Sequence, residues 1–138
     1  MNRYLLDTNV VSELRKPKPH GAVVAWISEL QENQIYLSAV TIGELQAGVE
    51  QTRKHDSHKA AQIQLWIDSL EQSYQVLAMD SSCLRELARL MCGKPDTLLE
   101  DLMIAATARV HELTVATRNE RDFAASGVRI FNPFKTIP

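Results

Sequence analysis

Four acidic residues stand beside predicted secondary-structure elements and could together bind a divalent cation. Asp7 ends the first predicted strand, and Glu44 lies in the first helical turn after the second. Asp101 opens the helix that leads into the fourth strand, and Asp122 follows that strand. Ligands of open parallel sheets collect outside the carboxyl ends of the strands, so these acids are expected to converge. Converging carboxylates raise one another's pKa, and Mg²⁺ or Mn²⁺ relieves that repulsion with oxygen ligands.

The segment 98–111 has helical length and contains neither Gly nor Pro. Asp101 shares the i, i+3, i+4, i+7 row with Ile104, Ala105 and Ala108, so its carboxylate heads an apolar stripe. An unpaired charge there is costly, which favours a cation or a set of hydrogen bonds as its partner. A simpler role in stabilising the helix dipole remains open. Glu100 falls on a different row, with an easier route to water.

The remaining chain alternates strand-like and helix-like segments. Strands are predicted at 3–6, 34–40, 74–78, 113–116 and 128–131, and helices at 10–15, 21–30, 42–53, 59–72, 83–91 and 98–111. The polar stretch 52–58 is predicted to be a loop. This alternation implies right-handed crossovers, a three-layer α/β fold and a mainly parallel sheet of roughly five strands. We expect one domain over residues 1–138.

Composition bounds the function classes. The 138 residues are 45% hydrophobic and carry a net charge of −2, so no sequence-wide basic signature points to nucleic acid. Any nucleic-acid binding must therefore use a local patch or metal ions. Cys83 and Cys92 lack zinc-ligand spacing and are predicted to be reduced core thiols, as in a cytosolic protein. No signal peptide or membrane span is recognisable, so we expect a cytoplasmic protein without membrane contact.

Metal-bound carboxylates favour phosphoryl chemistry. Two cations can hydrolyse a phosphodiester, one activating the water and the other stabilising the leaving oxygen. A phosphatase of the haloacid type also uses an Asp after the first strand, but it needs a second Asp two residues later, where this chain has Asn9. A small α/β protein with scattered surface acids leaves their shared location unexplained.

Four stretches carry a family resemblance, and they cover nearly the whole chain. They are Leu5–Val10, Leu37–Leu45, Asp101–Ala108 and Val115–Phe123. Their order and their strand and helix contexts resemble those of PIN-domain ribonucleases. The chain looks most like the VapC-type toxins of type II toxin–antitoxin pairs, especially the FitB-like members, whose ending resembles Ile130–Pro133. One such stretch is a weak signal, but four in order are specific.

The resemblance implies a Mg²⁺- or Mn²⁺-dependent endoribonuclease. It implies metal held by Asp7, Glu44, Asp101 and a fourth acid, cleavage of RNA such as tRNA or rRNA, dimerisation, and inhibition by a cognate antitoxin. Family members differ in the fourth acid, and we assign it to Asp122 because the alternative position holds Asn119. A non-catalytic PIN-like scaffold that binds RNA is the alternative function.

Further polar residues are expected to support the site or the substrate. Supporting roles are assigned to Thr8, Asn9, Thr117 and Asn119, with helix capping an equal alternative for the first two. Weak candidates for phosphate contact are Arg15, Lys16, Arg118 and Arg121, for which ordinary surface charge is the competing interpretation. Single-stranded or loop RNA is the expected substrate, because its exposed backbone can enter a narrow crevice.

Overall fold

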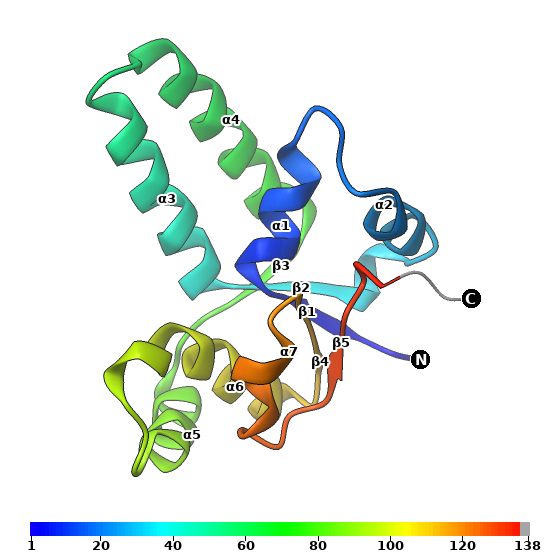
Figure 1. Ribbon diagram of the computed structural model, residues 1–138, viewed down its shortest axis with the longest axis vertical. Coiled ribbons are helices and arrows are strands. Elements are labelled where there is room, and N and C mark those ends of the chain that lie inside the picture. The colour runs from blue at the N-terminus through cyan, green and yellow to red at the C-terminus, as the bar shows by residue number, and fades with distance from the viewer. Residues whose placement is uncertain (136–138) are drawn as a thin grey trace.

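Five parallel strands form the central sheet of the computed structural model, which describes residues 1–135 (Figure 1). The strands are β1 (Tyr4–Leu6), β2 (Ile35–Ser38), β3 (Gln75–Leu77), β4 (Thr114–Ala116) and β5 (Ile130–Phe131). Their order is β3-β2-β1-β4-β5, so β1 lies between β2 and β4. The chain moves outward from β1 to β3 and then returns to the other side of β1. This change of direction creates a topological switch point between β1 and β4.

Seven α-helices connect the strands within the described part of the chain. They are α1 (Thr8–Arg15), α2 (Gly21–Ser28), α3 (Ala39–Arg53), α4 (Ser57–Ser73), α5 (Ser81–Met91), α6 (Leu99–His111) and α7 (Glu120–Ala124). Short 3₁₀ turns occupy Glu32–Gln34 and Asp96–Leu98. In Figure 1, α1 to α4 lie above the sheet and α5 to α7 below it, which confirms the predicted three-layer α/β fold.

Side chains that alternate along β1 enter two different cores. Tyr4 and Leu6 pack with α1 and α2 on one face, whereas Leu5 packs against α6 on the other. This is the period-two pattern of a strand buried on both sides. A third, smaller core of Val49, Ala60 and Ile67 joins α3 to α4. This helix pair projects away from the sheet in Figure 1.

Some predicted boundaries and environments were wrong. Residues 39 and 40 were assigned to a strand, but Ser38 ends β2 and caps α3, its Oγ accepting from the Val40 amide at 3.1 Å. The predicted loop 52–58 is shorter, since Asp56 caps α4 through the Lys59 amide at 3.0 Å. Helix α7 was not predicted. Cys83 is buried as expected, but Cys92 is exposed and is no core thiol.

None of the helices within residues 1–135 combines the length and hydropathy that a membrane crossing requires.

Candidate active site

Asp7 and Thr117 meet at the switch point between β1 and β4. Asp7 follows β1 directly and is only 4% exposed, and Thr117 follows β4 and is fully buried. Thr117 Oγ1 donates to Asp7 Oδ2 at 2.8 Å, and the Asp7 amide donates to the Ala116 carbonyl at 2.9 Å. Asp7 also caps α1, since Oδ1 accepts from the Thr8 amide at 2.8 Å. Its carboxylate therefore has a fixed position at the carboxyl edge of the sheet.

Asn9 and Asn119 hold Thr117 in place. The Asn119 amide donates to Thr117 Oγ1 at 2.9 Å, and Asn9 Nδ2 lies 3.5 Å from the same oxygen. Asn9 Oδ1 accepts from the Arg118 amide at 3.3 Å. One hydroxyl can donate once and accept twice, so Thr117 uses its proton on Asp7 and its lone pairs on the two asparagines. The structure thus gathers Thr117, Asn9 and Asn119 beside Asp7, and Asn119 contributes its backbone amide.

Glu44 reaches the same site through threonine hydroxyls. Thr8 Oγ1 lies 3.0 Å from both Glu44 Oε1 and Thr41 Oγ1, and its single proton can go to either. Thr41 is buried, and sequence reasoning missed it. Glu44 was expected in the first turn of its helix, but α3 begins at Ala39, which places Glu44 in the second turn. The longer helix brings Glu44 to the start of α1, beside Asp7.

Asp101 and Asp122 open helices on the other side of Asp7. Asp101 lies in the first turn of α6, and the rest of its predicted row is buried. Asp122 lies in the first turn of α7, and its negative charge raises the pKa of both Asp7 and Asp101. Asn119 has no ionisable group and caps α7 without a side-chain hydrogen bond. Asp122 therefore acts on the site through its charge, which Asn119 cannot do, and it stays the predicted fourth acid.

Burial and repulsion from neighbouring carboxylates raise the pKa values of Asp7 and Asp101. Burial raises the pKa of Asp7, hydrogen bonds from Thr117 and Thr8 oppose this rise, and Asp122 adds to it. Burial, then Asp7, Asp122 and Glu100, raise the pKa of Asp101 to about 6. Ionising all the acids of the cluster therefore costs free energy in the folded protein, as expected of a site that binds cations.

Glu100 belongs to this cluster, which the sequence did not reveal. Its exposure agrees with the predicted route to water, but its carboxyl also faces Glu44. Burial is the largest cause that raises the pKa of Glu44 to about 7, and Glu100 and Asp7 contribute to that rise. The only sequence signal was the neighbouring position of Glu100 and Asp101. A cavity of about 420 Å³ opens beside these two residues and Leu99.

The donor set matches a hard divalent cation in chemistry. All the clustered ionisable groups are carboxylates, with no Cys or His among them, and Mg²⁺ and Mn²⁺ prefer oxygen ligands. The pKa values of Asp7, Glu44 and Asp101 are raised first by burial and then by neighbouring carboxylates, whose repulsion a bound cation would relieve. Within residues 1–135, no three His, Cys, Asp or Glu side chains stand close enough together to hold one ion. The acids are therefore near neighbours without forming a closed cage.

The predicted basic residues are spread over a wider surface. Arg15 stands at the far end of α1 from Asp7, with its guanidinium 5.9 Å from the Trp66 ring centre. Lys16 pairs with buried Glu13 at 2.9 Å. Arg121 is exposed on α7. The structure therefore does not gather these three at the acids.

Arg118 is the best-positioned cation beside the site. Its guanidinium carbon lies 3.7 Å from the centre of the Phe134 ring, and Nη2 lies 3.9 Å from Glu13 Oε1. Glu13 also accepts from the His20 amide at 2.9 Å. Sequence reasoning missed Glu13, although a lone acid beside the apolar residues Val10, Val11 and Leu14 was a signal. These contacts orient the Arg118 side chain, while its backbone amide donates to Asn9 Oδ1.

Comparisons with known proteins match nearly the whole chain. The family model for the PIN domain matches residues 4–127. The chain is 36% identical over 137 residues to "Toxin FitB" of Neisseria gonorrhoeae, covering 94% of this chain and 97% of that protein. It is 37% identical over 141 residues to "VapC ribonuclease Y4jK" of Sinorhizobium fredii, covering 95% and 97%.

A solved structure has the same architecture over nearly the whole chain. "Structure of FitAB bound to IR36 DNA fragment" contains a chain that superposes with a TM-score of 0.86 at 32% identity, covering 98% of both chains. The parallel sheet, the acids at its switch point and the matched family model therefore lead to one conclusion: this chain belongs to the PIN-domain family.

Proposed function

We propose that this chain is an endoribonuclease toxin that uses Mg²⁺ or Mn²⁺ to hydrolyse RNA and is inhibited by a cognate antitoxin. The reaction is in-line attack of water on a phosphodiester, leaving a 5′-phosphate and a 3′-hydroxyl. Asp7, Glu44, Asp101 and Asp122 are the proposed metal ligands. The proposed substrate is cellular RNA such as tRNA or rRNA, and the proposed place of action is the cytoplasm.

One observation carries this proposal: Asp7, Glu44 and Asp101 come from separate segments yet lie near enough for carboxylate charges to act on one another, and Asp122 adds its charge to theirs. Glu44 has a pKa of about 7 and Asp101 of about 6, and Asp7 or Asp122 contributes to each shift. A scaffold that only binds RNA gains nothing from concentrated negative charge, which repels phosphates. Cation binding accounts for the cluster, because a bound cation removes the repulsion between the carboxylates.

The chain's own residues hold and orient the acids. Thr117 donates to Asp7, and Thr8 lies within hydrogen-bond distance of Glu44, so the carboxylates keep defined positions. Bound divalent cations would supply a water of lowered pKa and stabilise the leaving oxygen. Arg118, fixed over Phe134, is suited to contact a phosphate beside the cleaved bond. No histidine base is required, and none of the residues in the cluster is a histidine.

The partner proteins are proposed from the relatives. One matching solved structure is of FitAB bound to a DNA fragment, and another is "Crystal Structure of FitAcB from Neisseria gonorrhoeae", with 37% identity and a TM-score of 0.79. We extend this to the present chain as binding of a cognate antitoxin by a toxin homodimer. Copurification of the chain with its genomic neighbour's product would test the partnership.

Cleavage of RNA tests the proposed activity. Purified protein, freed of any antitoxin, is incubated with total cellular RNA in Mg²⁺, Mn²⁺ or EDTA, beside the Asp7→Asn and Asp101→Asn variants. Asp68→Asn is the matched control, because this acid is exposed on α4, away from the cluster. We expect discrete metal-dependent cuts by the wild type and the control alone. Metal-dependent cutting that persists in both site variants would overturn the assignment of the site.

Binding separates the alternative function from the proposed one. A scaffold binds RNA tightly without cutting it, and Asp7→Asn leaves that binding unchanged or stronger. Titration of Mn²⁺ into the wild type and into Asp101→Asn measures the cation site independently of catalysis. We expect weaker Mn²⁺ binding by the variant, and equal binding would contradict the proposed ligand set.

A further inference from the structure

A cavity of about 470 Å³ lies on another part of the surface, between α5, the end of α6 and the loop before β5. Four arginines line it, and we call it the arginine pocket. They are Arg85, Arg89, Arg109 and Arg129. Two glutamates, Glu86 and Glu112, complete its charged lining, which leaves an excess of two positive charges. The whole chain has a net charge of −2, so the pocket reverses the overall sign.

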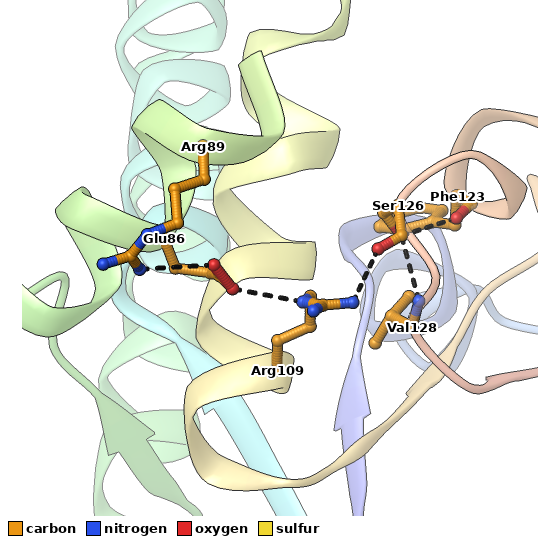
Figure 2. A network of polar contacts seen from close by, with 6 residues as sticks. All are labelled: Glu86, Arg89, Arg109, Phe123, Ser126 and Val128. Carbon is orange, nitrogen blue, oxygen red and sulfur yellow. Dashed lines mark hydrogen bonds and ion pairs between the residues drawn. The ribbon is translucent and has the colours of Figure 1, made fainter. Parts of the chain in front are cut away.

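Glu86 orders two of these arginines. Its Oε1 accepts from Arg89 Nη1 at 3.4 Å, and its Oε2 accepts from Arg109 Nε at 3.2 Å (Figure 2). Arg109 continues across the pocket, where Nη1 donates to the Ser126 carbonyl at 2.9 Å. These bonds use two of the five N–H donors of Arg109. The remaining donors of a fixed guanidinium can bind a ligand with little further loss of side-chain entropy.

Gly127 makes room for this arrangement. Its φ is +73°, and a Cβ at this position would lie 3.0 Å from Arg109 Nη1. Any other residue would therefore combine an unfavourable backbone conformation with a contact that displaces Arg109. Gly127 leaves space for the Arg109 side chain, and the Ser126 carbonyl accepts its hydrogen bond. Arg109 is therefore held at the wall of the cavity.

Arg85 and Arg129 supply the uncompensated charge. Neither forms an ion pair with any acid in residues 1–135, whereas Glu86 accepts from the other two arginines. Guanidinium groups bind phosphate oxygens through two parallel N–H bonds, which makes arginine the preferred residue for phosphate recognition. An acidic chain that acts on RNA needs such a local patch to offset its overall repulsion.

We propose that the arginine pocket binds phosphate groups of the RNA backbone, away from the carboxylate site. This inference rests on the proposed function for its choice of polyanion. Arg109 lies eight residues beyond Asp101 on α6, about 12 Å along the helix axis at the usual rise. The pocket is thus a second contact that holds an RNA strand while another part of the strand occupies the carboxylate site.

Fluorescence anisotropy of a labelled 20-nucleotide single-stranded RNA of mixed sequence measures this binding. The titrations are made in EDTA, where metal-dependent cleavage cannot occur, over a range of salt concentrations. The test variant is Arg85→Gln/Arg129→Gln. The control is Lys54→Gln/Lys59→Gln, which removes the same charge from exposed positions around the α3–α4 turn.

We expect the arginine double variant to bind RNA roughly 10-fold more weakly at low salt, and its slope of log affinity against log salt to be shallower by about 1.4. The lysine control should retain the wild-type slope. Equal losses in both variants, or no loss in either, would overturn the pocket. A third variant, Arg85→Lys/Arg129→Lys, should bind with intermediate affinity, because it keeps the charge but loses the paired donors. If this variant binds RNA as tightly as the wild type, positive charge alone explains the binding, and a site that recognises phosphate through paired guanidinium donors is overturned.

Two further arms separate the explanations. Displacement of the RNA by poly-glutamate as effectively as by unlabelled RNA would assign the pocket to an acidic peptide and overturn the RNA proposal. Failure of the nuclease proposal appears as missing metal-dependent cleavage, whereas failure of this inference appears as unchanged binding by Arg85→Gln/Arg129→Gln. The two outcomes are therefore independent.

Discussion

Thr117→Val tests how the site holds its buried carboxylate. The substitution keeps the shape of the side chain but removes the hydroxyl that donates to Asp7 Oδ2 at 2.8 Å. It also takes the acceptor from the Asn119 amide, which lies 2.9 Å from Thr117 Oγ1. Thr117 is fully buried and Asp7 is 4% exposed, so water cannot replace these bonds easily. Thr117→Ser is the matched control, because it retains the hydroxyl.

The expected cost depends on the charge of Asp7. A hydrogen bond to an ionised group contributes about 1.5–3 kcal/mol, and a neutral one about 0.5–1.5 kcal/mol. Burial raises the pKa of Asp7, so its carboxyl becomes protonated more readily on acidification than a free aspartic acid does. The free energy of unfolding of Thr117→Val, relative to Thr117→Ser, should therefore fall by roughly 1 kcal/mol more at pH 8 than at pH 4.

Urea denaturation measures this difference through the fluorescence of Trp26 and Trp66, without divalent cations. RNA cleavage in Mg²⁺ should also fall by about 10- to 100-fold in Thr117→Val, as is usual when a residue that orients a metal ligand is lost. A cost of the valine substitution that is independent of pH would refute the reasoning, because it would show that Thr117 does not stabilise the charged form of Asp7.

Three further outcomes follow from the same structure. Without divalent cations, the unfolding temperature should fall as pH rises from 5 to 8. Folding favours the protonated forms of Asp101, with a pKa of about 6, and Glu44, with a pKa of about 7, so ionisation of these groups destabilises the folded protein. Mg²⁺ should restore the unfolding temperature, and a temperature that does not change with pH would contradict the raised pKa values. Glu44→Gln should raise the metal-free unfolding temperature at pH 8 while abolishing most of the stabilisation by Mg²⁺, as differential scanning fluorimetry would show. Gly127→Ala should lower the free energy of unfolding by about 1–2 kcal/mol in urea, because φ is +73° and the new Cβ meets Arg109. The control Gly21→Ala, where no atom lies within 4 Å, should be neutral or slightly stabilising, and similar effects of the two would contradict this account.

Local pattern was sufficient for most of the architecture. Alternation of buried positions along β1 and the apolar row after Asp101 on α6 are properties of short segments, so they are legible in the sequence. The limits of the elements were less legible. Ala39 and Val40 continue an apolar run after β2, and only the cap formed by Ser38 shows that the helix has already begun.

The sequence also indicated which acids could form a site, because Asp7 and Asp101 each stand at the edge of a recognisable element and Asp122 follows the fourth strand. Tertiary structure alone decided what surrounds them. The hydroxyl of Thr117 reaches Asp7 across 110 residues, because β4 lies beside β1, and no local pattern encodes that pairing. The charge on Glu100 raises the pKa of Glu44 because α6 lies near α3 in the folded chain. The arginine pocket likewise exists only where α5, α6 and the loop before β5 meet. Segment periodicity fixes which face of an element is buried, whereas contacts between distant segments depend on the order in which the strands pack.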